Sequence, residues 1–286
     1  MKTKFLRKTL AVAFVSAFAA YSVQASAISL AFDQNTGFVV NNTLLSNGPA
    51  GSQNNDIVWY ASSSDAPVAP SGQTFGTIAW GLPATTSNNN PGGGLVGFDP
   101  FTVGNNADNR YSGLEVVGLS GNITENWTSI STIYHHNSEI NGLASVLASA
   151  NIYSDLTLGL GSNQNTVPIT SFAETTNATP CPTPNPLGST CDDRFTFDFS
   201  GFNSIVYDDG IVKYLVEFRL GNVNNAFTNF PNCPGGSCSV WTREFTTSSI
   251  DVQARISEIP EPGTLALFSL SLLGLAGLKR RAKSEN

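Results

Sequence analysis

The chain contains two histidines, His135 and His136, and they are adjacent. Imidazole is the side chain best suited to proton transfer and metal binding near neutral pH. The flanking Ile133-Tyr134 favours a strand, in which neighbouring side chains point to opposite faces. The two imidazoles are therefore not expected to share a metal ion or a substrate. A structural hydrogen-bonding role is expected for both, with no catalytic residue and no metal ligand.

The four cysteines form two close pairs, Cys181 with Cys191 and Cys233 with Cys238. Locally paired cysteines form disulfides in an oxidising compartment, and of the three possible connectivities we prefer these two local bridges. Each would close a short loop and contribute about 2–3 kcal/mol by the loop-entropy estimate. A zinc site needs C-x₂-C spacings, which the nine and four intervening residues here do not provide.

Acidic turns offer a second kind of ligand chemistry, because calcium binds carboxylate and carbonyl oxygens. The candidates are Asp192-Asp193, Asp208-Asp209-Gly210 and Asn105–Asn109. None completes the D-x-[DN]-x-[DN]-G loop pattern, and such turns are common without metal. No cofactor is therefore expected, with Ca²⁺ as the one candidate ligand.

Aromatic side chains provide the third possibility, a sugar-binding face. Trp59-Tyr60, Trp80, Trp127 and Trp241 are available, and most of them are expected in the core. The motifs of hydrolases, G-x-S-x-G and H-E-x-x-H, are absent from the sequence. We therefore expect no enzymatic activity, and a hydrolase is the third-ranked hypothesis.

Short alternating runs are the elements that must position these residues. Apolar and polar residues alternate in 250–256, in 212–219 and in 195–199, and Asn- and Gly-rich clusters separate such runs. This pattern is typical of an antiparallel β-sandwich, of jelly-roll or immunoglobulin-like type. We therefore expect an all-β domain over residues 28–257.

Composition agrees with this fold class and excludes others. Only 12% of the 286 residues are charged, and there are 26 glycines and 15 prolines, which argues against a helix bundle or a coiled coil. Residues 28–259 contain six basic and nineteen acidic side chains. Nucleic acid is excluded as a partner, because its binding leaves a basic footprint.

Basic residues are concentrated at the ends instead. Lys2, Lys4, Arg7 and Lys8 precede an uncharged apolar stretch and the small-x-small sequence Ala25-Ser26-Ala27. This arrangement predicts a secretory signal peptide over residues 1–27, cleaved after Ala27 following export by the Sec translocon. The alternative is an uncleaved N-terminal anchor.

The C-terminal segment, 258–286, has three parts. Pro260-Glu261-Pro262 precedes the apolar run 265–278, and Lys279, Arg280 and Arg281 follow it. The 17 uncharged residues from 262 to 278 would span about 25 Å as a helix, against about 30 Å of hydrocarbon. A single hydrophobic helix of marginal length is expected, with its basic end in the cytoplasm. A permanent tail anchor is the simpler alternative.

These three parts, in this order, resemble the PEP-CTERM sorting signal of exopolysaccharide-producing Gram-negative bacteria. The resemblance implies a transient inner-membrane tether and cleavage near Pro260-Glu261-Pro262 by an exosortase, an intramembrane transpeptidase. The product would reach the cell surface or be released. Exopolysaccharide is a further candidate partner.

A second resemblance lies within residues 80–193. His135-His136-Asn137 is similar to the H-x-N signature of the THxN and choice-of-anchor families of PEP-CTERM proteins, with Tyr134 in place of the first Thr. Trp80-Gly81-Leu82-Pro83 and Cys191-Asp192-Asp193 agree with it. The families have no established activity, so the resemblance implies a surface protein and no chemistry. We expect a non-enzymatic cell-surface or biofilm-matrix protein. The alternative is a calcium- or carbohydrate-binding adhesion module on the same scaffold.

Overall fold

The computed structural model describes residues 28–39, 44–46, 58–60, 74–80, 112–137, 146–159, 161–173, 180–181, 184–199, 204–233, 236–259 and 271. All sixteen elements assigned within these ranges are strands, so the expected all-β class is confirmed. The segments expected to form the signal peptide and the C-terminal helix, 1–27 and 260–286 apart from Ser271, lie outside the described residues.

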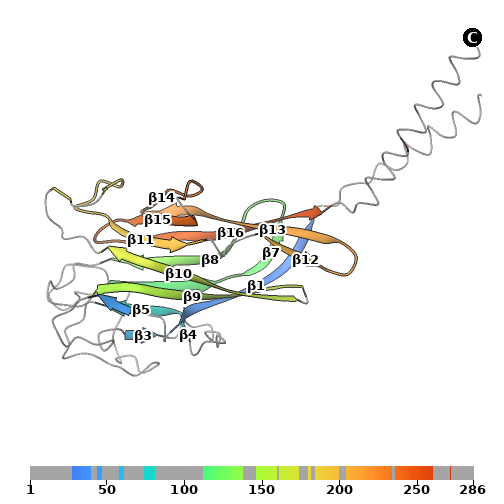
Figure 1. Cartoon of the computed structure of the whole chain (residues 1–286), viewed down its shortest axis with the longest axis horizontal. Coiled ribbons are helices and arrows are strands. Elements are labelled where there is room, and N and C mark those ends of the chain that lie inside the picture. Colours follow the sequence, from blue (N-terminus) through green and yellow to red (C-terminus); the bar gives the residue numbers. More distant parts are fainter. Residues whose placement is uncertain are drawn as a thin grey trace, which may run out of the picture.

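The strands pair into two antiparallel sheets (Figure 1). The larger sheet has the order β14 (Ala226–Thr228), β15 (Ser237–Thr242), β11 (Asp193–Asp198), β10 (Gly161–Ala173), β9 (Val146–Leu158), β1 (Ser29–Val39) and β4 (Thr74–Phe75). To it belong β2 (Leu44–Ser46), which pairs with β9, and β7 (Ser120–Thr124), which pairs with β1. The smaller sheet has the order β12 (Ile205–Asp208), β13 (Lys213–Asn224), β16 (Thr247–Ile259), β8 (Thr128–His136), β6 (Ser112–Gly118), β5 (Thr77–Trp80) and β3 (Val58–Tyr60).

One hydrophobic core lies between the two sheets, which gives the molecule its sandwich-like architecture. Alternate residues of β16 face it: Ile250, Val252, Ala254 and Ile256 are buried. The larger sheet contributes side chains such as Phe38 and Phe195 to the same cluster. The alternation predicted for this segment is thus the core-facing side of β16.

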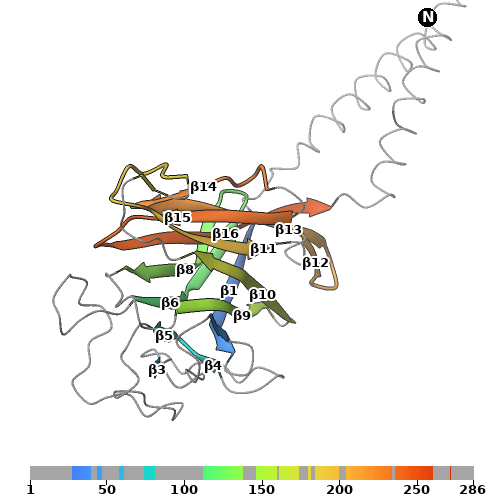
Figure 2. The ribbon, with the colours of Figure 1, turned by 60° about the vertical axis from the view of Figure 1, so that its left-hand side comes forward.

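The larger sheet is strongly curled. Figure 2 shows β1 running steeply across the direction of β15 and β16. The chain passes between the two sheets at five described connections. Three are single residues: Gly76 between β4 and β5, Leu119 between β6 and β7, and Asn225 between β13 and β14. The other two are residues 125–127 between β7 and β8 and residues 243–246 between β15 and β16.

Leu119 shows how such a corner is fastened. Its carbonyl oxygen accepts a hydrogen bond from the Gln34 N–H of β1 (2.9 Å), and its own N–H donates to the Ile130 carbonyl of β8 (2.9 Å). One residue thus joins both sheets through the backbone. The preceding Gly118 is packed so closely that a Cβ atom there would overlap the Gln34 carbonyl. A residue with a side chain cannot occupy this corner without moving the backbone.

Both disulfides are formed, Cys181–Cys191 and Cys233–Cys238, which is the pairing preferred from the sequence. The first closes the loop that precedes β11. The second joins the loop after β14 to β15, where Cys238 is 1% exposed and belongs to the core.

Candidate functional site

The sorting segment begins directly where the folded domain ends. Strand β16 continues through Ile259, two residues into the segment expected from 258, and the next residue is Pro260. Ile259 lies opposite Lys213 in β13, and Glu258 lies opposite Tyr214. No spacer therefore separates the last paired strand from the Pro-Glu-Pro sequence.

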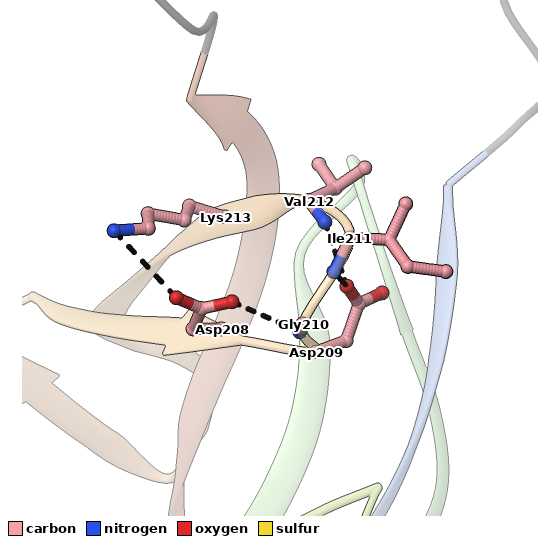
Figure 3. Close-up of polar contacts among 6 residues, drawn as sticks. All are labelled: Asp208, Asp209, Gly210, Ile211, Val212 and Lys213. Carbon is pink, nitrogen blue, oxygen red and sulfur yellow. Dashed lines mark hydrogen bonds and ion pairs between the residues drawn. The ribbon is translucent and has the colours of Figure 1, made fainter.

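The turn between β12 and β13 lies at this same end of the sheet (Figure 3). Asp208 pairs with Lys213, which is level with Ile259, so residues 209–212 lie beyond the last pair of β16. The Asp208 carboxylate accepts the Gly210 N–H (2.9 Å), and Gly210 has a φ of 89°. The carboxylate of Asp209 accepts the N–H groups of Ile211 (2.8 Å) and Val212 (2.7 Å).

These hydrogen bonds occupy the carboxylates of the turn. The N–H groups of Val212 and Ile211 lower the pKa of Asp209 by binding its carboxylate. Lys213 Nζ lies 3.6 Å from Asp208 Oδ2, but both side chains are more than half exposed, so this ion pair adds little. The Asp208-Asp209-Gly210 sequence, a calcium candidate, therefore uses carboxylate oxygens to close a turn.

The first strand begins at the same end of the molecule. Tyr207 of β12 packs against Gly159 in the β9–β10 turn, and Leu30 of β1 lies beside that glycine. Figure 3 shows the blue start of β1 and the red end of β16 around the β12–β13 turn. Both predicted processing junctions therefore leave the domain at one pole, which we call the exit pole (the start of β1, the β12–β13 turn and the end of β16).

His135 is a core residue. It is 2% exposed, stacks on Trp80 at 5.9 Å and meets the ring edges of Phe172 and Phe195 of the other sheet. Nδ1 lies 2.8 Å from Thr242 Oγ1, and Nε2 has no hydrogen-bond partner among the described residues. Burial, with a smaller contribution from His136, holds the pKa of His135 well below its usual value. The ring is thus a neutral part of an aromatic cluster that joins both sheets.

His136 and Asn137 fasten neighbouring strands. His136 Nδ1 lies 3.0 Å from Thr247 Oγ1, and Nε2 lies 3.4 Å from Glu115 Oε2. Asn137 is completely buried; its backbone N–H donates to the Thr246 carbonyl and its amide to the Arg243 carbonyl. The two imidazoles have separate partners, as the alternation of a strand predicts. The H-x-N residues therefore make structural contacts in the core and at the β15–β16 connection.

Asp192 organises the disulfide loop before β11. Its carboxylate accepts the Leu187 N–H (2.6 Å) and the Ser189 hydroxyl, and its own N–H donates to Asn185 Oδ1 (3.1 Å). Asp192 is fully buried. Within the described ranges no three His, Cys, Asp or Glu side chains gather as a metal site would require. The third acidic candidate, 105–109, lies outside those ranges.

The tryptophans have three different environments. Trp80 is fully buried in the His135 cluster. Trp127 is covered by two guanidinium groups, those of Arg219 at 4.4 Å and Arg255 at 4.6 Å from the ring centre. Trp241 lies opposite Phe227 on the edge strand pair β14–β15, with ring centres 5.6 Å apart. The side chains of Trp59 and Tyr60 are outside the description.

Two features were not singled out from the sequence. The first is the arginine pair around Trp127, in which Arg219 Nε donates to Gln253 (2.8 Å) and Arg255 Nε to Glu217 (2.9 Å). The alternation of polar residues in β13 and β16 indicates that one face of these strands is exposed. Only the strand register shows that Arg219 and Arg255 on this face lie beside Trp127. The second is Ile211, the most exposed large apolar side chain described, at 83%.

The sorting residues Pro260, Glu261, Pro262, Lys279, Arg280 and Arg281 and the cleavage residues Ala25 and Ala27 lie outside the described part of the chain. Comparison with known families covers the first group: residues 258–281 match the PEP-CTERM protein-sorting motif. No curated protein matches the chain. Among the described residues no helix is long and apolar enough to cross a membrane.

The matched segment defines the class of protein. A PEP-CTERM motif implies an exported protein that is sorted through the membrane to the cell surface and processed by an exosortase. The match does not extend into residues 80–193, so the resemblance to the THxN and choice-of-anchor families stays a sequence-based expectation.

Proposed function

We propose that this protein is a non-enzymatic component of the cell surface or of an exopolysaccharide matrix, tethered transiently in the inner membrane by its C-terminal helix and released from it by an exosortase. The observation that carries the proposal is the sorting motif at 258–281. Two disulfides support an oxidising destination. The H-x-N residues would act in folding, since their polar atoms bind the protein's own strands.

The Pro-Glu-Pro glutamate tests the sorting step. In the native host, Glu261→Ala should leave the protein in the membrane fraction at its uncleaved mass. Glu125→Ala is the control: Glu125 is an exposed glutamate outside the matched segment 258–281, and this variant should be processed normally. Normal trimming and release of the Glu261 variant, measured by intact mass, would contradict the proposal.

A carbohydrate-binding module is the alternative, favoured by one surface. Phe227 is 45% exposed at the sheet edge, and Trp241 beside it is flanked on its other side by Arg194 of β11. An aromatic pair next to a cation suits stacking against a sugar ring. Glycan arrays with and without chelator would show whether binding exists and whether calcium takes part. Loss of a glycan signal in Phe227→Ala would favour this alternative.

A further inference from the structure

The β12–β13 turn holds an apolar side chain outward at the exit pole. Ile211 is 83% exposed, whereas the other exposed large apolar side chains described range from 40% to 57%. The N–H groups of Ile211 and Val212 bind Asp209, and that of Gly210 binds Asp208, so the turn backbone is closed from within (Figure 3). The side chain is therefore presented at a fixed place, and none of the described strands covers it.

Chain length places this turn close to a membrane. Six residue steps separate Ile259 from Leu265, where the apolar run begins. Even a fully extended chain covers only about 20 Å in that distance. The turn reaches about 6 Å further than Ile259 along the strand direction. Since the headgroup layer is about 5–8 Å thick, the turn and the bilayer surface lie within reach of each other.

We propose that the exit pole rests on the bilayer while the C-terminal segment is still attached, with Ile211 inserted into the interfacial layer. The inference rests on the proposed function, because that segment supplies the tether. A branched aliphatic side chain contributes about tenfold or more to partitioning when fully buried. Partitioning of one side chain would hold a free protein only weakly at the bilayer. The C-terminal tether makes the contact intramolecular and so raises the effective concentration of the bilayer surface.

Charge at the exit pole selects the kind of lipid. Asp208, Asp209 and Glu258 lie near the turn, and Lys213 is the basic residue among them. An anionic surface would repel this group of carboxylates. The contact therefore fits zwitterionic headgroups and weakens as anionic lipid is added.

Fluorescence quenching by brominated lipid tests the contact. The full-length chain, purified from a host without exosortase so that its C-terminal segment is retained, is reconstituted in phosphatidylcholine vesicles. Ile211→Trp places a reporter at the turn. Val223→Trp is the matched control, because Val223 is exposed near the far end of β13, about 33 Å along the strand from Lys213 at the turn.

We expect brominated lipid to quench the added emission of Ile211→Trp at least twofold more than that of Val223→Trp, and less with 30% anionic lipid. Equal quenching in protein that floats with the vesicles would overturn the contact while leaving the sorting proposal intact. Quenching that requires added exosortase would also overturn it, in favour of a protein partner. If the protein does not float with the vesicles, its C-terminal segment is not a membrane tether. That result would overturn both the membrane contact and the proposed function.

Discussion

At the scale of single residues, the chain's titratable rings and carboxylates are used for construction. His135 lies among Trp80, Phe172 and Phe195, where a charged imidazolium would be poorly solvated. The carboxylates of Asp192 and Asp209 accept hydrogen bonds from backbone N–H groups of loops. Each group stabilises a local conformation that the backbone alone would not keep.

The buried imidazole makes stability depend on pH. Below pH 6.5 the unfolded chain takes up a proton at His135, whereas the folded protein, in which the pKa is lowered, does not. The free energy of unfolding should therefore fall with decreasing pH by up to about 1.4 kcal/mol per pH unit from this group. Between pH 7.5 and 5.5 the decrease in melting temperature should be smaller in His135→Phe than in the parent protein. Equal decreases in both would contradict a buried neutral ring.

At the scale of elements, the two sheets depend on strands that turn from one into the other. Leu119 bonds to β1 and β8 at once, and Gly118 permits the approach. Such corners let a curled sheet close over the core without leaving buried backbone groups unpaired.

Gly118→Ala should therefore be costly. Its Cβ would overlap a backbone carbonyl, which cannot rotate away as a side chain can. We expect a loss of about 3 kcal/mol or more in urea unfolding. Gly161→Ala is the control, since its Cβ would lie at an ordinary 3.5 Å from the Tyr207 ring and should change stability by less than about 1 kcal/mol. Similar effects of both substitutions would show that the corner is not closely packed.

The second disulfide holds an edge of the larger sheet. Replacing Cys233 and Cys238 together with Ala should lower the free energy of unfolding by about 2 kcal/mol, the loop-entropy value for so short a loop. The measurement is the urea midpoint without reductant. Adding reductant to the parent protein should also lower its urea midpoint. An unchanged midpoint in the variant would mean that the bridge does not restrain the unfolded chain.

At the scale of the whole molecule, both predicted processing junctions leave from the exit pole. Ser29 begins β1 and Ile259 ends β16, with the β12–β13 turn between them. A precursor held at both ends can therefore fold with one face toward one membrane. In the sequence, Pro260 follows directly on Ile259, the last residue of β16 paired with β13.

A spacer tests whether the folded end of β16 slows cleavage. If the end of β16 must separate from Lys213 and Tyr214 before the peptidase can bind an extended chain, four Gly and Ser residues inserted after Ile259 should accelerate cleavage. Pulse–chase labelling in the native host measures the rate. A rate equal to that of the parent protein would show that the peptidase accepts the junction as it is.

Much of this could be predicted from the sequence because the relevant signals are local. Alternation within single strands specified the all-β class, since it depends on neighbours in the chain. The disulfides join cysteines ten and five residues apart, so proximity along the chain favoured the observed pairs. The sorting motif is a linear signal, recognised as a string of residues and independent of the fold.

Other features depended on which strands meet and in what register. His135 and Thr242 are 107 positions apart, and Arg219 reaches Trp127 only because β13, β16 and β8 are neighbours. Likewise, only the pairing of Lys213 with Ile259 places the β12–β13 turn beside the end of β16. Export and processing were thus determined by sequence alone, because short segments carry them. The tertiary structure decided which side chains are buried and which residues surround the exit pole. Both depend on how strands distant in the sequence pack together.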